Sequence, residues 1–272
     1  MLVMRRLLPQ NIFLINSCMQ NNKKQLDKIL PLGLLATRQY ILSQGVNRHA
    51  FDNAVKSGKL LSVCRGVYVR DGLPLTWQAV TTSLNVYTEF HPVYIGGISA
   101  LELSGLGHFI KDLSVLHVYS FIKKPVLLEH LDLNLEFIWH GTKRIWDVSI
   151  YQKKNNFTSV QWREDVPAYL MASVEQACLE VLAPVPNGIS FEYVDVLFQG
   201  LSSLSPRKLD FLLRRCKSIK AKRLFFWFAK RHGFQWFKHL NINDYDLGSG
   251  KRRIAIDGVL DKELLITVPD LI

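Results

Sequence analysis

The chain has 272 residues, of which 48% are hydrophobic and 21% are charged, with a formal net charge of +11. This length favours two domains or three small ones, and the apolar content favours buried cores over long disordered segments. No stretch approaches the ~20 apolar residues of a membrane-spanning helix, so we expect a soluble, cytoplasmic protein without membrane contact. The four cysteines form no C-x-x-C pair, which argues against a structural zinc site and suits a reducing cytosol.

The charge is concentrated in two basic blocks around an acidic middle. Residues 23–72 carry a net charge of +6 and residues 200–253 carry +11, whereas residues 73–199 carry −5. Basic blocks attract phosphate backbones or acidic partners, although such charge gives no sequence specificity.

Residues 1–22 are faintly similar to a secretion or lipoprotein signal. An apolar run follows Arg5-Arg6 and ends at Cys18, but polar residues and a proline interrupt it. The stretch MQNNKKQLDKILPLG, which starts at Met19, has the character of a natural beginning. We therefore expect residues 1–22 to be a loose N-terminal arm or the product of an upstream start codon.

Residues 23–73 have the outline of a winged helix-turn-helix domain. A short amphipathic helix is expected over residues 23–30, and Thr37 can cap a second helix that ends at Gly45. Asn47 can cap the next helix, which should run from Arg48 to about Ser57. A β-hairpin is then expected, with strands over 60–64 and 67–70.

The helix after Asn47 has two different faces. Its apolar face consists of Ala50, Phe51, Ala54 and Val55, and its opposite face of Arg48, His49, Asp52, Asn53 and Lys56. Arg and Asn are residue types that read base edges in the major groove. The sequence therefore predicts DNA contact by this helix and the wing.

The residues that we expect to contact DNA lie in the two helices, at the cap and in the wing. They are Arg38, Asn47, Arg48, His49, Asn53, Lys56, Lys59 and Arg65. Arg48 and Asn53 are expected to contact bases, and the lysines and Arg65 to contact phosphates. The alternative is a structural or protein-binding module whose basic helix face is only solvated.

A turn-rich link at Gly72-Leu73-Pro74 separates this domain from residues 75–272, for which we expect a mixed α+β domain with a possible sub-boundary near residues 165–172. The expected elements are helices over 75–90 and 98–106, strands over 93–95, 113–119, 133–140, 148–151 and 158–162, helices over 173–182, 191–201, 206–216 and 220–232, and a terminal hairpin of 254–256 with 264–268. The fold class is therefore α+β.

Three segments resemble functional motifs, and for each we favour a plainer interpretation. GGISALELSGLGH lacks the spacing of a phosphate loop, so we expect a tight turn from strand to helix. In the stretch DYDLGSGKR, Tyr245 stands where a phosphate loop needs its first glycine, which favours an ordinary turn. The aromatic residues of helix 220–232 could stack on bases, but we expect a core helix with solvated ends.

No catalytic or metal-binding pattern is recognisable. The sequence contains neither H-E-x-x-H nor G-x-S-x-G, and its eight histidines show no i, i+3 or i, i+4 pairing. We therefore expect no catalysis, no metal and no cofactor.

The order of these segments resembles the AbiEi family, the antitoxins of the AbiE abortive-infection, type IV toxin–antitoxin systems. VNRHAFDNAVKSGKLLSVCRGVYV is similar to the DNA-binding domain of that family, and ISALELSGLG to the segment that follows it. KRLFFWFAKRHGFQWFKHLNINDYDLGSGKRRI and DKELLITVP resemble the C-terminal antitoxin domain. The matches run from about residue 23 to 269, whereas His49 and Asp52 depart from the family pattern.

The resemblance implies a repressor and antitoxin. The winged domain would bind inverted repeats in its own promoter, with possible cooperation between protomers. The C-terminal domain would counter a nucleotidyltransferase-like toxin, and the family implies no stable complex with that toxin. The alternatives are a stand-alone regulator whose C-terminal domain senses a ligand or binds RNA, and a nucleic-acid-processing enzyme with an unrecognised site.

The second basic block offers a possible second interaction surface. Its dense part contains Arg207, Lys208, Arg214, Arg215, Lys217, Lys220, Lys222 and Arg223. Like charges this close together repel one another, so such a patch often has a partner. That partner would be flanking DNA or an RNA, and the alternative is a solvated face that only aids solubility.

Overall fold

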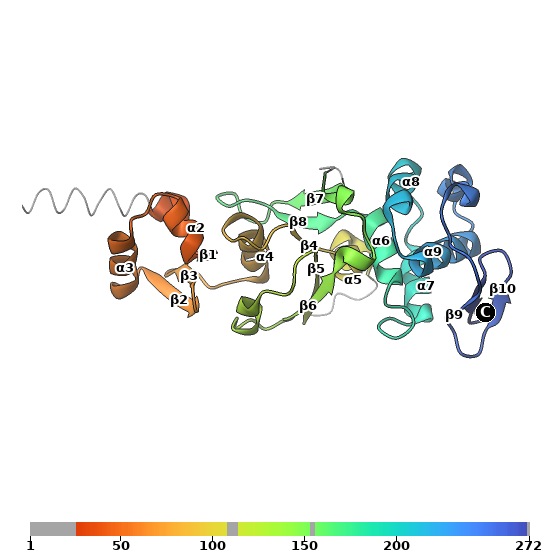
Figure 1. The fold of residues 1–272 in the computed structure, drawn as a ribbon, viewed down its shortest axis with the longest axis horizontal. Coiled ribbons are helices and arrows are strands. Elements are labelled where there is room, and N and C mark those ends of the chain that lie inside the picture. The colour runs from red at the N-terminus through yellow and green to blue at the C-terminus, as the bar shows by residue number, and fades with distance from the viewer. Residues whose placement is uncertain (1–25, 108–113, 153–155, 271–272) are drawn as a thin grey trace, which may run out of the picture. The chain divides into compact units, whose positions relative to one another are not determined.

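The structure is a computed structural model that describes residues 26–107, 114–152 and 156–270 (Figure 1). The chain forms two compact units. Of the described residues, the N-terminal unit contains 26–91, 125–133 and 162–167, and the C-terminal unit contains 92–107, 114–124, 134–152, 156–161 and 168–270.

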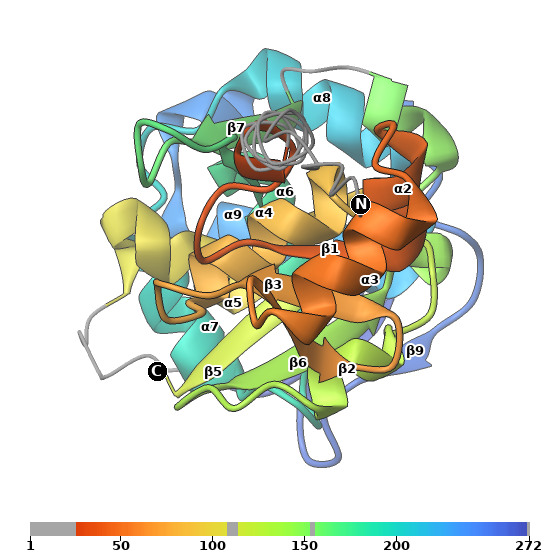
Figure 2. The ribbon, with the colours of Figure 1, turned by 90° about the vertical axis from the view of Figure 1, so that its left-hand side faces the viewer.

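The N-terminal unit has the winged helix-turn-helix arrangement. Its elements are a helical turn over residues 26–29, β1 (Leu35–Thr37), α2 (Arg38–Ser43), α3 (Arg48–Lys56), β2 (Leu60–Cys64), β3 (Val67–Arg70), α4 (Trp77–Val86) and the 3-10 helix η2 (Val126–Glu129). The three strands form an antiparallel sheet in the order β1-β3-β2, and α3 lies beside β2 (Figure 2). The hairpin and both helices are confirmed, whereas β1 was not predicted.

Local signals in the sequence determine where α2 and α3 begin. The Thr37 hydroxyl accepts a hydrogen bond from the Tyr40 amide at 3.1 Å, and Asn47 Oδ1 accepts one from the Ala50 amide at 2.8 Å. Both are N-caps, which satisfy amides that have no partner within the helix. The turn after α2 contains Gly45 with φ +88°, a conformation that glycine adopts without strain.

The core of the N-terminal unit extends beyond residue 73. It includes Ala79, Tyr87 and Val166 as well as residues of the winged domain. The Leu35 amide donates to Ser83 Oγ at 3.0 Å, and the Thr37 amide donates to the Tyr87 carbonyl at 3.1 Å. A fragment that ends at residue 73 would therefore lose part of its core and two hydrogen bonds of β1.

The C-terminal unit is built on a five-stranded mixed sheet in the order β6-β5-β4-β8-β7. Its strands are β4 (Val93–Ile95), β5 (Val115–Ser120), β6 (Glu136–Gly141), β7 (Phe157–Val160) and β8 (Tyr169–Ala172). The pairs β5–β6 and β4–β8 are parallel, and β4–β5 and β7–β8 are antiparallel. The sequence predicted four of these strands and missed β8.

Helices complete the C-terminal unit. They are α5 (Gly97–Leu101), the π-helical turn η1 (Glu102–Leu106), α6 (Val174–Leu182), α7 (Phe191–Gln199), α8 (Pro206–Arg215), α9 (Ile219–His232) and the 3-10 helices η3 (Thr142–Arg144), η4 (Val148–Gln152), η6 (Gln235–His239) and η7 (Ile242–Asp244). On α9, the side chains of Leu224, Phe225 and Phe228 are fully buried. The prediction of a core helix is therefore confirmed, and these aromatic rings are not free to stack on bases.

Two predicted strands were wrong. Residues 148–151 belong to η4, because Asp147 Oδ1 accepts the Ser149 amide at 2.9 Å and turns the chain there. The predicted terminal hairpin has a different first strand. The small sheet has the order β10-β11-β9, in which β10 (Val259–Asp261) is antiparallel to β11 (Ile266–Val268) and β9 (Arg252–Arg253) is parallel to it.

Candidate nucleic-acid interface

The orientation of α3 is set by the packing of its inner face. Phe51 is 2% exposed and its ring meets that of Tyr68 on β3 edge-on, with centroids 4.9 Å apart. Such an aromatic contact favours a single orientation of the helix against the wing. The opposite face of α3 is therefore held toward solvent.

Four residues that were predicted to contact DNA lie on this outer face of α3. Arg48, His49, Asn53 and Lys56 are all exposed. Within the described residues, Arg48 and Lys56 have no ion pair or hydrogen bond from their side chains. Two cations without an acidic partner are free to bind phosphate or base edges.

Asp52 places one negative charge beside these cations. Its carboxylate lies 3.8 Å from the Arg38 guanidinium, and that guanidinium also lies 5.1 Å from the centroid of the Phe51 ring. Both partners are exposed, so the pair contributes at most about 1 kcal/mol and is easily exchanged for a phosphate contact. Arg38 therefore offsets the repulsion that Asp52 would exert on a DNA backbone.

Asn47 has a structural role that limits its part in DNA contact. Its side-chain oxygen accepts the Ala50 amide and caps α3, which holds the side chain against the start of the helix. The wing presents Arg65 at the β2–β3 turn, where Gly66 has φ +82°, and Lys59 just before β2. The structure thus presents both wing cations on the surface and leaves Asn47 as the cap of α3.

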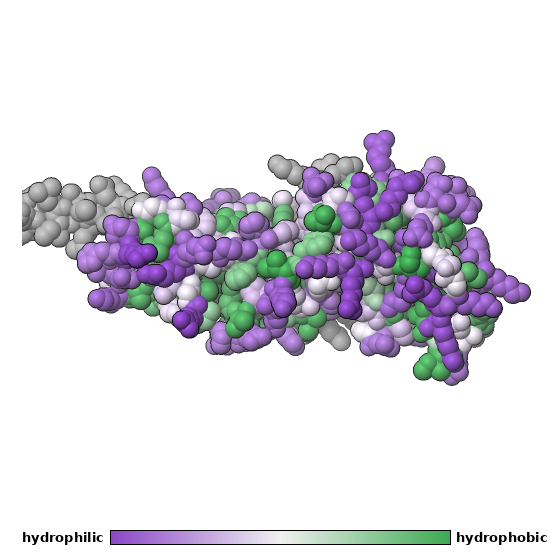
Figure 3. All heavy atoms as spheres, in the orientation of Figure 1, coloured by the Kyte–Doolittle hydropathy of each residue, from purple (hydrophilic) through white to green (hydrophobic). Residues whose placement is uncertain are grey.

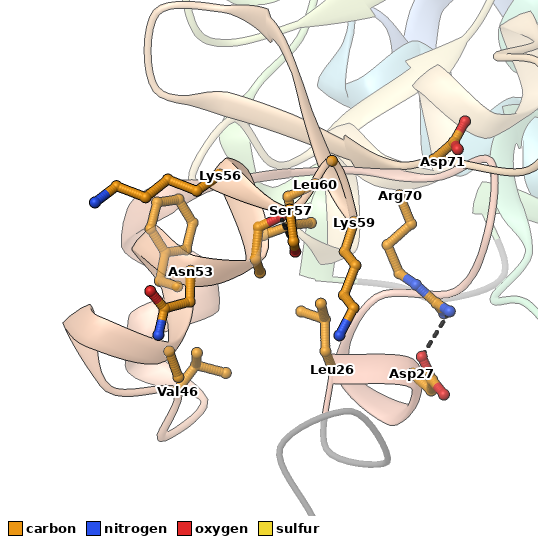
Figure 4. A pocket seen from close by; sticks show the side chains of 14 residues that line it. Leu26, Asp27, Val46, Asn53, Lys56, Ser57, Lys59, Leu60, Arg70 and Asp71 are labelled. Carbon is orange, nitrogen blue, oxygen red and sulfur yellow. Dashed lines mark hydrogen bonds and ion pairs between the residues drawn. The ribbon is translucent and has the colours of Figure 1, made fainter. Parts of the chain in front are cut away.

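A pocket of about 680 Å³ lies beside α3, and no pattern in the sequence predicted it. Both Lys56 and Lys59 line it, and Figure 4 shows Lys59 extending toward Leu26, whereas the end of the Lys56 side chain extends outward from α3. Arg70 forms a 2.6 Å ion pair with Asp27 at its edge and donates to the Leu30 carbonyl at 3.0 Å. Lys56, but not Lys59, therefore has the geometry of an outward phosphate contact.

The second basic block is less exposed than its sequence suggests. Lys222 is 4% exposed and Arg223 is 1% exposed, so neither belongs to a surface patch. The Arg223 guanidinium donates to the carbonyls of Leu247, Gly248, Gly250 and Leu265 at 2.7 to 3.1 Å. Arg223 therefore holds the glycine-containing loop of the stretch DYDLGSGKR in place.

Most of the remaining cations of this block have partners. Arg214 lies 2.9 Å from the Asp210 carboxylate, Lys217 lies 3.9 Å from that of Asp147, and Lys208 lies 3.7 Å from that of Glu175. The Arg215 guanidinium lies 3.7 Å from the centroid of the Phe211 ring and Nε donates to Ser149, and Lys220 Nζ donates to the Val185 carbonyl. Arg207 is exposed. Hydrophilic residues cover much of the visible face of this unit (Figure 3).

The two motif-like segments of the C-terminal unit make structural contacts. In GGISALELSGLGH, β4 leads directly into α5, and the Gly97 amide donates to the Glu180 carboxylate at 2.9 Å instead of facing a ligand. In DYDLGSGKR, Asp246 Oδ1 accepts the Gly248 amide at 2.8 Å, which is ordinary turn chemistry. The predictions of a tight turn from strand to helix in the first segment and of an ordinary turn in the second are therefore confirmed.

Glu180 is the centre of a buried polar cluster that the sequence did not reveal. Its carboxylate accepts hydrogen bonds from Tyr94, Trp146 and the Gln176 amide at 2.7 to 2.9 Å. Burial raises the pKa of the Glu180 carboxyl, and these hydrogen bonds oppose that rise. A Cβ at Gly96 would lie 2.4 Å from Glu180 Oε2, so a glycine is required at this close approach. The cluster ties α6 to the sheet.

Two histidines that lie far apart in the sequence meet on the parallel strands β5 and β6. His117 Nδ1 lies 2.9 Å from His140 Nε2. Burial lowers the pKa of both imidazoles, and the pKa of His140 falls to about 4, with the nearby His117 as a second cause. The two rings are therefore neutral at pH 7. Within the described segments, no three His, Cys, Asp or Glu side chains are gathered as metal ligands.

No helix in the described part of the chain is long and apolar enough to span a membrane.

Comparison with known proteins identifies the family. A family model described as the N-terminal domain of the AbiEi antitoxin, a transcriptional regulator, matches residues 19–112, and a second, described as transcriptional regulator, AbiEi antitoxin, type IV TA system, matches residues 115–269. A comparison with curated proteins finds no match. The crystal structure of the RV2827C protein from Mycobacterium tuberculosis is similar, with a TM-score of 0.45 and 13% identity over 97% of this chain and 92% of that chain. The chain therefore belongs to the AbiEi family of transcriptional regulators, the antitoxins of type IV toxin–antitoxin systems.

Proposed function

We propose that this AbiEi protein binds inverted repeats in its own promoter through α3 and the wing, and thereby represses its operon. The observation that carries this proposal is the outer face of α3, where Arg48 and Lys56 are exposed without an acidic partner among the described residues. Inverted repeats would place two protomers on one promoter, which allows cooperative binding.

We also propose that the protein counters a nucleotidyltransferase-like toxin of the same operon without forming a stable complex with it. Membership of the antitoxin family supports this second role. In this proposal the protein acts by binding rather than by catalysis, and the C-terminal unit supplies the antitoxin action.

The promoter-binding proposal is tested by substituting Arg48. Arg48→Ala should weaken binding to the upstream region by about 1–3 kcal/mol and relax specificity at one base pair, because it removes a contact to base edges. Arg48→Lys keeps the charge but cannot bind a guanine through two parallel hydrogen bonds, so it should retain non-specific affinity and lose specificity. Fluorescence anisotropy on promoter and scrambled duplexes measures both effects.

A matched control is Lys28→Ala, which removes an exposed cation from the same unit that is not part of α3. It should bind the promoter almost as the unmodified protein does. Unchanged promoter affinity in Arg48→Ala would show that α3 does not read this operator.

Co-expression of the toxin with variants of this protein tests whether promoter repression and toxin neutralisation depend on different units. The Arg48→Ala variant should still rescue growth, because the substitution lies in the N-terminal unit, but a promoter–reporter fusion should be derepressed at least severalfold. Loss of rescue by Arg48→Ala at equal protein level would contradict a division of labour between the units. Rescue by residues 23–91 alone would contradict it as well.

A further inference from the structure

A second pocket, of about 460 Å³, lies within the C-terminal unit. It is lined by Val185, Pro186 and Asn187 before α7, by Lys220 on α9 and by residues 252–254. Small-molecule sites commonly have volumes of about 300–1,000 Å³. The pocket is therefore large enough for a compact ligand.

The lining of this pocket is strongly cationic. It contains Lys220, Arg252 and Arg253 and, among the described residues, no acidic side chain. The Arg252 guanidinium has neither an ion pair nor a hydrogen bond with any described residue. This arrangement differs from the rest of the second basic block, where Arg214 and Lys217 lie beside carboxylates.

The backbone and two of the cations are held in place before any ligand binds. The Arg252 amide donates to the Leu265 carbonyl at 2.8 Å, which anchors β9 to the small sheet. Lys220 Nζ donates to the Val185 carbonyl at 2.7 Å, and the Arg253 guanidinium donates to the Ile256 carbonyl. Such preorganisation lowers the entropic cost of binding an anion.

Burial and neighbouring charges act on two cations in and beside the pocket. Burial lowers the pKa of Lys220. Burial also lowers the pKa of Arg223, the charge of Arg252 lowers it further, and the charge of Asp246 opposes that fall. A bound anion would stabilise the charged form of Lys220, which lines the pocket.

The shape and charge of the pocket favour a small phosphorylated ligand over a nucleic-acid strand. A strand needs a row of free cations along its backbone. Lys251 is exposed beside Arg252, but the cations Arg214, Lys217 and Lys230 elsewhere on this unit are ion-paired, which interrupts such a row. Arginine and lysine are the usual ligands of phosphate oxygens. Pro186 and Ile254 add an apolar wall, and the Asn187 amide adds a hydrogen-bonding group.

We propose that this pocket binds the phosphate chain of a free nucleotide, with Arg252 and Lys220 contacting phosphate oxygens and the nucleoside lying toward Pro186 and Asn187. This binding would give the C-terminal unit a small-molecule ligand. The proposal goes beyond promoter repression and does not depend on it, since none of its residues lies in the N-terminal unit.

Isothermal titration calorimetry of the full-length chain tests the proposal, with ATP, GTP, CTP, UTP and inorganic tripolyphosphate as probes. We expect at least one nucleoside triphosphate to bind, and tripolyphosphate to compete with it. Arg252→Gln should weaken binding at least tenfold, because it removes the unpaired cation. Lys217→Gln, which removes the same charge from an ion-paired site, should bind as the unmodified protein does.

Arg252 is exposed, so Arg252→Gln should keep the thermal unfolding midpoint of the unmodified protein. Arg253→Gln provides a second variant with the same expected direction. The proposal is overturned if no probe binds at millimolar concentration, or if Arg252→Gln and Lys217→Gln lose affinity equally, which would indicate attraction to net charge alone. It is also overturned if Arg252→Gln weakens binding of a 20-nucleotide RNA or a duplex DNA while no small probe binds.

Discussion

The α3 face and the second basic block both carry dense positive charge, but their cations have different surroundings. On α3, Arg48 and Lys56 are exposed and lack ion pairs with described residues. In the second block, Arg214 lies 2.9 Å from a carboxylate and Arg223 is 1% exposed. Residues 200–253 carry the larger net charge in the sequence. Their proportion of cations without a partner among the described residues is nevertheless smaller than in residues 23–72.

This difference has a physical cause. A basic residue next to an acidic one in space must give up that partner before it binds phosphate, and a buried arginine cannot reach a ligand at all. A count of charges along the sequence shows neither the ion pairs nor the burial. For example, Asp147 pairs with Lys217, which lies 70 positions further along the chain. Net charge thus predicts attraction at long range, whereas contact depends on individual environments.

The largest expected effect concerns Arg223. Arg223→Met should lower the free energy of unfolding by about 3 kcal/mol or more, because four carbonyls lose a charged hydrogen-bond donor in a buried site. Arg214→Met removes the same charge from an exposed ion pair and should lower the free energy of unfolding far less. Urea unfolding of both variants measures the difference. Equal stability of the two would show that Arg223 is a surface cation after all.

The winged part of the fold could be predicted almost residue by residue. Caps and turns there are encoded locally, since Thr37 and Asn47 cap their helices and Gly66 lies at the hairpin turn with a positive φ. β1 was missed because it has three residues and directly precedes α2. Its residues pair with β3 residues that lie 30 to 34 positions further along the chain, which no local pattern reveals.

The C-terminal unit was harder to predict for the same reason. β9 pairs with β11 in parallel and ends at Arg253. The amides of Ile254 and Ala255 still donate to the Thr267 carbonyl, but Ile256 is 78% exposed although its hydrophobicity suggests a strand. The cluster around Glu180 and the pair of His117 and His140 are formed by residues from separate elements. At the candidate interface, the sequence identified the exposed cations but could not show that Arg38 pairs with Asp52.

A smaller effect is expected from removing the negative charge on α3. Asp52→Asn should strengthen promoter binding, by less than about 1 kcal/mol, because it removes repulsion toward the backbone and frees Arg38. Asp210→Asn frees Arg214 in the same way in the second block and should change promoter affinity less. Anisotropy titrations at low salt compare the two variants. If Asp210→Asn increased promoter affinity more than Asp52→Asn, the second basic block would contribute more to DNA binding than α3, contrary to our expectation.

We infer that the cations of α3, which have no ion pair with a described residue, contact the DNA backbone more closely than the paired cations of the second block. The most direct test is the salt dependence of promoter binding by the full-length chain, measured for Lys56→Ala and Lys217→Ala. Each lost contact to duplex phosphate should lower the slope of log affinity against log salt concentration by about 0.9. We predict this loss for Lys56→Ala and a smaller change for Lys217→Ala. An unchanged slope in Lys56→Ala, or an equal loss in both variants, would contradict the account.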